Sequence, residues 1–133
     1  YRIDIQLNLV KKLPKVFGNI YKLEQVLLNL LSNSKDALLD IDNKRLIKIS
    51  TNLIDDSIQI VFCDNGDGIP AEIIQKIFIP FYTTKDPGKG TGLGLSITFG
   101  IINNMNGSII IDENYTTGTQ FIIKIPISNK MEK

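Results

Sequence analysis

The sequence has 133 residues, of which 43% are hydrophobic and 22% charged, and its formal net charge is +1. This length suits a single domain over residues 1–133 with a core of its own, and the balanced charge argues against nucleic-acid or membrane binding. Cys63 is the only cysteine, so no internal disulfide can form and a reducing, cytoplasmic compartment is expected. No apolar run approaches the ~18 residues of a membrane span. The sequence has no histidine, so chemistry that needs an imidazole must use one from another segment or polypeptide.

The first half of the chain has the pattern of one long helix between strands. Residues 2–9 alternate apolar and polar side chains, which predicts a strand with one buried face. Residues 22–40 have a helical period, and Asn19 is the candidate N-cap. Residues 46–53 and 57–63 are predicted strands joined by a turn at residues 55–56. The apolar arc of the helix comprises Leu23, Val26, Leu27, Leu30, Ser34, Ala37 and Leu38.

The second half has two further helices and two further strands. Pro70 begins a short predicted helix that runs through Ile77, and residues 95–105 form another that ends at residues 106–107. Residues 108–112 and 120–127 are predicted strands around a turn at residues 116–118. Because strands and helices do not alternate as βαβ units, we expect an α+β fold, a two-layer sandwich of a mixed sheet of about five strands with about three helices on one face.

Asn29, Asn33 and Asp36 form a narrow polar stripe on the long predicted helix, at positions i, i+4 and i+7. Such a stripe is commonly a solvent-exposed face. However, asparagine in a helix interior costs ~0.5 kcal/mol relative to alanine, so two of them invite a functional explanation. A carboxamide oxygen can ligate Mg²⁺. One neutral oxygen cannot hold the ion alone, so the metal and a phosphate-bearing nucleotide are expected to bind together.

Residues 64–70 (DNGDGIP) follow the end of an apolar strand. Asn-Gly and Asp-Gly are strong turn signals, and a simple turn is one interpretation. Asp64, however, lies at the buried end of the strand and needs a hydrogen-bond donor. The exocyclic amine of a purine would serve, and Gly66 and Gly68 would let a flat ligand approach the backbone closely.

Residues 88–95 carry glycine at every second position directly before a predicted helix. This segment is either a flexible surface loop or a phosphate site made of backbone amides at a helix N-terminus. It matches neither the P-loop nor the dinucleotide fingerprint. We expect residues 83–92 to be mobile without nucleotide. Lys85 could reach a phosphate, and Thr119 belongs to a turn that could touch ligand.

Five motifs in order give the chain a resemblance to a known family. Residues 23–38 (LEQVLLNLLSNSKDAL) resemble the N box of sensor histidine kinases, and residues 64–70 resemble the first glycine box. Residues 77–85 (IFIPFYTTK), 88–96 (GKGTGLGLS) and 118–121 (GTQF) are similar to the F box and the two remaining glycine boxes. Nearly the whole chain therefore resembles the ATP-binding catalytic domain of these kinases, in the GHKL superfamily that includes DNA gyrase and heat-shock chaperones. The resemblance implies a Bergerat-type α/β sandwich.

The resemblance also implies residue roles. Asn33 would ligate Mg²⁺, and Asn29 would lie near the phosphates. Both asparagines would be catalytic residues. Asp64 would accept a hydrogen bond from the adenine amino group, and Thr119 would support the adenine end. Other contacts to the base would come from Gly66, Gly68 and Ile69, and contacts to the phosphates from Lys85, Gly90, Thr91, Gly92, Leu93, Gly94 and Leu95.

The chain departs from the family pattern at three positions. Ser34 stands where alanine is usual, Asn19 where aspartate is common, and Ile79 where glutamate is common. Only the last removes an expected contact, an acidic one at position 79.

By this resemblance the chain binds Mg-ATP and donates the γ-phosphoryl group to a histidine. The acceptor would lie on a separate two-helix dimerisation and phosphoacceptor segment, and a response regulator would act downstream. Two alternatives are an ATP hydrolase or clamp and a non-catalytic nucleotide-binding module. Hydrolysing relatives place a glutamate four residues before the Mg²⁺ asparagine. Here that residue is Asn29, which cannot act as a general base.

Overall fold

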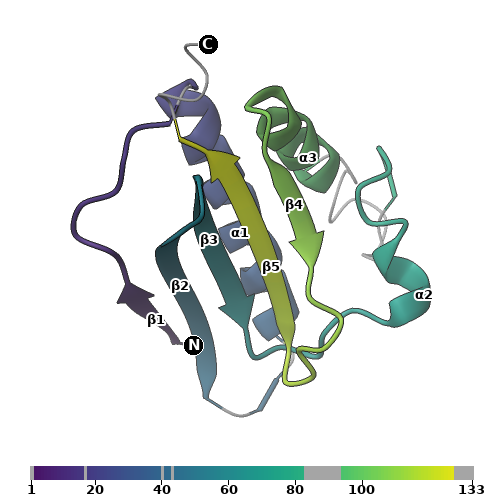
Figure 1. The fold of residues 1–133 in the computed structure, drawn as a ribbon. Coiled ribbons are helices and arrows are strands. Elements are labelled where there is room, and N and C mark those ends of the chain that lie inside the picture. The colour runs from purple at the N-terminus through teal and green to yellow at the C-terminus, as the bar shows by residue number, and fades with distance from the viewer. Residues whose placement is uncertain (1, 17, 40, 43, 83–93, 128–133) are drawn as a thin grey trace.

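The computed structural model describes residues 2–16, 18–39, 41–42, 44–82 and 94–127, and they form a mixed five-stranded sheet with helices against one face (Figure 1). The strands are ordered β1-β2-β3-β5-β4, with β1 parallel to β2 and the other neighbours antiparallel. The predicted α+β two-layer architecture is confirmed. In chain order the elements are β1 (Ile3–Asn8), α1 (Ile20–Leu38), β2 (Arg45–Ile54), β3 (Ser57–Asp64), α2 (Ala71–Ile74), α3 (Gly94–Asn104), β4 (Ser108–Ile111) and β5 (Thr119–Pro126).

Helix α1 begins at the predicted cap and buries one arc of its surface. The Asn19 side-chain oxygen accepts hydrogen bonds from the backbone N–H groups of Tyr21 and Lys22, at 2.8 and 3.3 Å, which satisfies two of the amides that a helix start leaves unpaired. The buried arc is narrower than the sequence suggests, since Ala37 is exposed. Its four buried residues are Val26, Leu30, Ser34 and Leu38.

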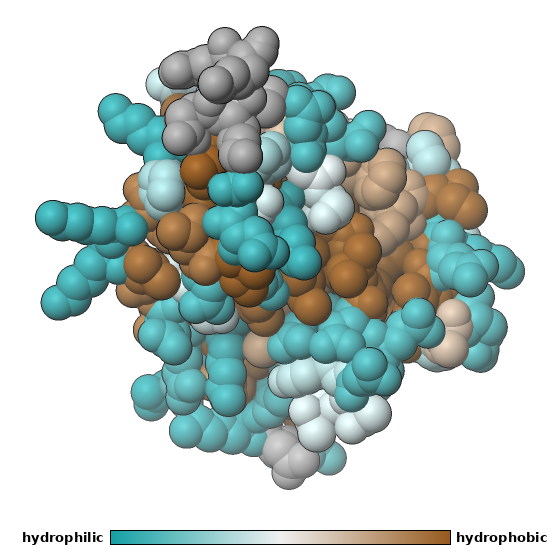
Figure 2. Space-filling view, viewed as in Figure 1, coloured by the Kyte–Doolittle hydropathy of each residue, from teal (hydrophilic) through white to brown (hydrophobic). Residues whose placement is uncertain are grey.

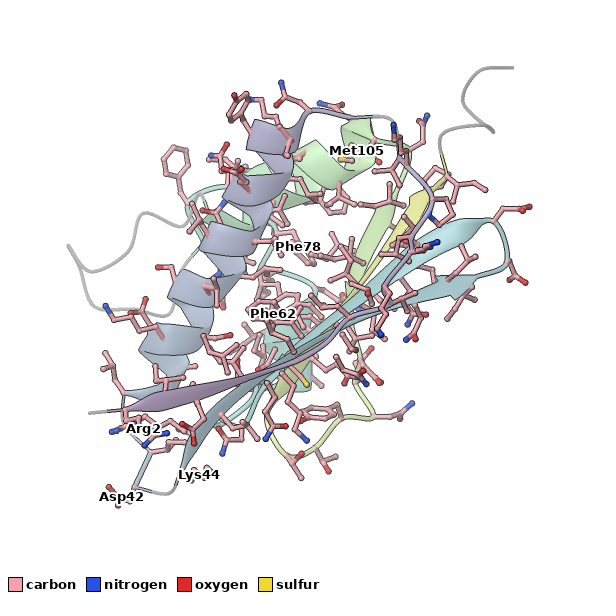
Figure 3. The ribbon with its side chains drawn as sticks, turned by 90° about the vertical axis from the view of Figure 1, so that its left-hand side faces the viewer. Arg2, Asp42, Lys44, Phe62, Phe78 and Met105 are labelled. Atoms are coloured by element: carbon pink, nitrogen blue, oxygen red, sulfur yellow. The ribbon has the colours of Figure 1, made fainter. Side chains whose placement is uncertain are left out.

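The hydrophobic core lies between α1, α3 and the sheet. Figure 3 shows Phe62 of β3 in the layer between α1 and the strands. Alternate residues of β3 and β5 face this layer, as the two-residue period of a strand requires. The largest fully buried side chains besides Phe62 are Leu30, Leu38, Ile47, Ile102, Ile123 and Ile125.

No helix of the described residues lies on the other face of the sheet (Figure 1). Strand register places Val61, Ile122 and Ile110 side by side on β3, β5 and β4, and Ile110 is 53% exposed. Figure 2, which shows this face, has hydrophobic side chains interspersed among polar ones. An antiparallel sheet with one face to the core and one to solvent commonly has this composition.

The prediction of a buried face on the first strand is wrong beyond its first residue. Ile3 is half-buried, but Ile5, Leu7 and Leu9 are more than half exposed. The reason is position: β1 is an edge strand that pairs only with β2. Alternation alone does not reveal whether a helix lies over a strand.

The predicted helix from Pro70 through Ile77 is shorter in the structure. Helix α2 ends at Ile74, and turns follow, in which Lys76 donates to the Ile73 carbonyl and Ile79 to the Lys76 carbonyl. Pro80 disfavours helical backbone at the residue before it. Ile77 is nevertheless buried. The apolar spacing thus correctly identified a core residue, although that residue lies beyond the end of the helix. No helix in the described ranges is long and apolar enough to cross a membrane.

Candidate functional site

Asp64 is the last residue of β3 and is buried, with 5% of its surface exposed. The Ser34 hydroxyl of α1 donates to Asp64 Oδ2 at 2.9 Å, and the Gly66 backbone N–H donates to Oδ1 at 2.9 Å. Each carboxylate oxygen therefore has a protein donor and keeps a lone pair for a ligand. This arrangement fits an acceptor for a ligand amine.

Burial dominates the electrostatics of this carboxyl. Desolvation raises the pKa of Asp64 above its ordinary value of 3.8, and hydrogen bonds from the Gly66 backbone, the Ser34 side chain and the Thr119 backbone partly oppose the rise. Desolvation disfavours the charged form, whereas donors to the carboxylate favour it. A buried carboxyl with a perturbed pKa is typical of functional sites.

Two glycines let the β4–β5 connection approach Asp64 closely. Thr119 pairs with Asp64 across the antiparallel strands, and Gly118 precedes it with φ +148°. A Cβ atom on Gly118 would lie 1.9 Å from the Asp64 carbonyl oxygen. Gly68, with φ +81°, would bring a Cβ atom within 3.0 Å of the Gly118 carbonyl oxygen. Side chains at either position would separate the segments that surround the carboxylate.

Asn65 holds the segment after Asp64 against the start of β2. Its side-chain oxygen accepts from the Leu46 N–H at 2.8 Å, and its amide nitrogen donates to the carbonyl of Lys44. The turn chemistry of the 64–70 segment and its ligand role are therefore compatible: Asn65 builds the turn and leaves the carboxylate of Asp64 facing α1.

A pocket with a volume of about 120 Å³ lies beside Thr119, the strand partner of Asp64, although Asp64 itself is not among the residues that line it. It opens between α2 and the β4–β5 connection, and Ile69 and Thr119 line it. Two residues predicted to contact the nucleotide thus border a common hollow. The other lining residues are Ala71, Ile74, Ile111, Asp112, Glu113, Tyr115 and Gly118.

The polar stripe on α1 is not a plain solvent face, since Asn29, Asn33 and Asp36 are all partly buried. Asn29 Nδ2 donates to the Gly94 carbonyl at 3.1 Å and to Thr98 Oγ1 at 3.2 Å, which links α1 to the first turn of α3. Asn33 follows one helical turn after Asn29, so the two carboxamides share a face of α1.

The structure brings together part of the predicted site. The contacts above assemble Asp64, Gly66, Gly68, Ile69 and Thr119 at one end of the sheet, while Gly94 and Leu95 begin α3 beside Asn29. In the F-box segment, the Phe78 ring packs against the Phe99 ring at a tilt of 39°, with centroids 5.4 Å apart, whereas Phe81 is 72% exposed. The segment predicted to be mobile, residues 83–92, lies outside the described residues. So do five predicted phosphate contacts, Lys85, Gly90, Thr91, Gly92 and Leu93.

Sequence reasoning missed two polar residues of this region. Ser34 stands out from the sequence only as a departure from the family pattern, yet it donates to Asp64. Thr98 gives no motif signal, yet it is completely buried and donates to the Gly94 carbonyl at 2.9 Å. In both cases the available signal was a hydroxyl on a largely apolar helix arc, where a buried polar group needs a partner.

The donor set fits a cation that a nucleotide helps to hold. Carboxamide oxygens of the kind that Asn29 and Asn33 carry suit a hard divalent ion. Within the described ranges, no three histidine, cysteine or acidic side chains group closely enough to hold a metal by themselves. Phosphate oxygens would therefore have to complete the coordination.

Comparison with known proteins agrees with this geometry. The family described as histidine kinase-, DNA gyrase B- and HSP90-like ATPase matches residues 18–129. The chain belongs to this ATPase family. The solved catalytic domain of histidine kinase ThkA, in a nucleotide-free form, superposes with a TM-score of 0.80 at 34% identity, over 95% of this chain and 81% of that one. The chain is thus a catalytic, ATP-binding domain of the histidine kinase type.

Its relatives are much longer sensor kinases. The two-component sensor PprA of Pseudomonas aeruginosa is 37% identical over 121 residues, which cover 88% of this chain and 13% of PprA. Sporulation kinase E of Bacillus subtilis is 31% identical over 132 residues, which cover 98% of this chain and 17% of that kinase. The chain therefore spans less than a fifth of the length of either relative.

Proposed function

We propose that this domain binds Mg-ATP and transfers the γ-phosphoryl group to a histidine on a separate dimerisation and phosphoacceptor segment of a two-component kinase. The observation that carries the proposal is the buried Asp64 carboxylate, held by Ser34 and Gly66 next to Thr119. It offers an acceptor to the adenine amine. The chain itself has no histidine, so the acceptor belongs to a different segment.

The residues of this chain would act mainly by positioning. Asp64 and Thr119 would fix the base, with Gly66, Gly68 and Ile69 beside it, while Asn29 and Asn33 would lie toward the phosphates. Mg²⁺, held by the Asn33 carboxamide and phosphate oxygens, would supply charge neutralisation. The contacts proposed for Lys85 and residues 90–95 would complete the phosphate site. Positioning and electrostatic stabilisation account for most of the catalysis in phosphoryl transfer.

In the transfer itself, an imidazole nitrogen of the acceptor histidine attacks the γ-phosphorus. A nitrogen–phosphorus bond forms, and the bond from the γ-phosphorus to the bridging β–γ oxygen breaks, which releases ADP. Transfer is favoured over hydrolysis because Asn29 occupies the position at which hydrolysing relatives carry a base. A carboxamide cannot accept the proton of an attacking water, and Asn29 uses its amide hydrogens on α3.

Calorimetry of the purified chain with ATP and ADP, with and without Mg²⁺, tests the binding step. We expect binding of both nucleotides, and Asn33→Ala should weaken the Mg²⁺-dependent affinity for ATP more than metal-free binding of ADP. Absence of binding by the folded chain would contradict the proposal and favour a docking module.

Incubation with radiolabelled ATP tests the transfer step. The chain alone should acquire no acid-labile phosphate, and it should phosphorylate a histidine-bearing dimerisation segment supplied in trans. Stoichiometric self-phosphorylation, or steady ATP hydrolysis by the chain alone, would overturn this assignment.

A further inference from the structure

Two hydrogen bonds join Asn29 of α1 to the start of α3, and a third joins its two partners to each other. Asn29 Nδ2 donates to the Gly94 carbonyl at 3.1 Å and to Thr98 Oγ1 at 3.2 Å, and the Thr98 hydroxyl donates to the same carbonyl at 2.9 Å. Thr98 has no exposed surface. A buried hydroxyl within the apolar side of a helix is costly without partners, and here it has two.

The chemistry of these groups fixes the orientation of the Asn29 carboxamide. A backbone carbonyl can only accept hydrogen bonds, so the amide nitrogen and not Oδ1 must face Gly94. The single hydroxyl hydrogen of Thr98 is directed to the same carbonyl, and its oxygen lone pairs are then free to accept from Asn29. The reversed carboxamide would set Oδ1 against the Gly94 carbonyl oxygen, with no hydrogen between two acceptors.

Because both Nδ2 hydrogens are directed at α3, the side-chain group of Asn29 that remains for a ligand is its oxygen, Oδ1. No described residue donates a hydrogen bond to Asn29 Oδ1. Asn33, one turn further along α1, lies on the same helix face. We infer that Thr98 is a positioning residue, which holds the Asn29 carboxamide so that it presents an acceptor oxygen, and not an amide donor, to the cation that accompanies the nucleotide. This inference rests on the proposed function.

The orientation has a chemical consequence for the phosphate end of the site. An acceptor oxygen suits a divalent cation or one of its bound waters, whereas an N–H₂ group would bind a phosphate oxygen directly. Thr98 therefore assigns Asn29 to the cation and not to the phosphates. A valine at this position has nearly the shape of threonine but would leave one Asn29 hydrogen facing a methyl group.

Nuclear magnetic resonance of the Asn29 side-chain amide gives a test that needs no nucleotide. Loss of one amide signal pair in Asn29→Asp identifies the resonances. In the wild type and in Thr98→Ser these hydrogens should exchange slowly with solvent. In Thr98→Val at least one should exchange faster and shift. Rapid exchange in the wild type would overturn the inference, and this measurement decides the matter even where Thr98→Val fails to fold.

Calorimetry gives the functional test. Thr98→Val should weaken the Mg²⁺-dependent affinity for ATP by about threefold to tenfold, the size expected for one neutral hydrogen bond. Metal-free ADP affinity should change little, and Thr98→Ser should restore the wild-type response to Mg²⁺. Equal weakening with and without Mg²⁺ would show a merely structural role and overturn the inference. Failure of the wild type to bind any nucleotide would instead contradict the proposed function.

Discussion

The Ser34 hydroxyl on α1 donates a hydrogen bond to Asp64 Oδ2 at the end of β3, over 2.9 Å. This contact ties the central helix to the carboxylate that would receive the adenine amine. Ser34 is 2% exposed, so water cannot easily replace it as a donor. The bond favours the ionised form of Asp64, in opposition to the desolvation that raises the pKa of this carboxyl.

Ser34→Ala should therefore raise the pKa of Asp64 further. We expect a loss in the free energy of unfolding of about 1–3 kcal/mol where Asp64 is ionised, as for other hydrogen bonds to charged groups. The loss should shrink in acid, where a protonated carboxyl no longer depends on this donor. Chemical denaturation across pH would measure it. Ser32→Ala, on an exposed part of the same helix, is the matched control, and an equal loss at every pH would contradict the role given to Ser34.

Asp64→Asn should change how stability depends on pH. Because the pKa of Asp64 is raised in the folded state, the native protein holds this proton more tightly than the unfolded chain. Its contribution to stability is complete below the ordinary value of 3.8 and is lost as pH rises through the raised native value. Wild-type stability minus that of Asp64→Asn should thus fall with rising pH in that window, by at most about 1.4 kcal/mol per pH unit. A flat difference would exclude the shift.

The same variant tests adenine recognition. Replacing the carboxylate by a carboxamide removes a charged acceptor, and ATP affinity near neutral pH should fall by about 10-fold to 100-fold. The preference for ATP over GTP should fall with it, because the 6-oxo group of guanine offers no amine to Asp64. Competition binding with the two nucleotides measures both effects. An unchanged preference would mean that another group recognises the base.

Much of the fold could be predicted from local patterns, because each pattern reports a local cause. The α1 period, the cap at Asn19 and the turn at residues 55–56 depend on neighbours in sequence, and all three are present. The exposure of Ile5 and Leu7 could not be predicted in this way, since it depends on which strand lies at the sheet edge. Burial is decided by elements far away in the chain.

In the candidate site, too, features with a local cause could be predicted from the sequence, whereas contacts between distant segments could not. The motif containing Asp64 indicated a buried carboxylate in need of a donor, and the structure supplies several, among them the Ser34 hydroxyl and the Gly66 amide. The contacts of Asn29 with Gly94 and Thr98 span 65 and 69 residues. No periodicity within α1 or α3 encodes such a pairing. The assigned roles toward nucleotide remain predictions that binding measurements must test.

Asn19 provides a prediction about α1 alone. Asn19→Ala removes the acceptor for the N–H groups of Tyr21 and Lys22 and should lower the free energy of unfolding by about 1 kcal/mol. Asn19→Asp keeps an acceptor at the same place and adds a negative charge near the helix N-terminus, so it should match or slightly exceed the wild type. Thermal or urea denaturation compares the three proteins. A loss in Asn19→Asp as large as that in Asn19→Ala would refute the capping role.

Gly118 and Gly100 form a pair of matched substitutions with opposite expected signs. In Gly118→Ala the new methyl would sit 1.9 Å from the Asp64 carbonyl oxygen, at φ +148°, so the β4–β5 connection must move away from Asp64. We expect destabilisation by about 2–4 kcal/mol, and weaker nucleotide binding in whatever fraction folds.

In Gly100→Ala, inside helix α3, the new methyl group meets nothing within 4 Å. It should stabilise the domain by about 0.5–1 kcal/mol, because alanine has less backbone freedom to lose in a helix. Urea denaturation of both variants, with ATP titration of each, separates a general sensitivity to added methyl groups from the specific contact behind Asp64. If Gly118→Ala proved as stable as the wild type and bound ATP normally, the close approach of the two segments would not be needed to hold that carboxylate.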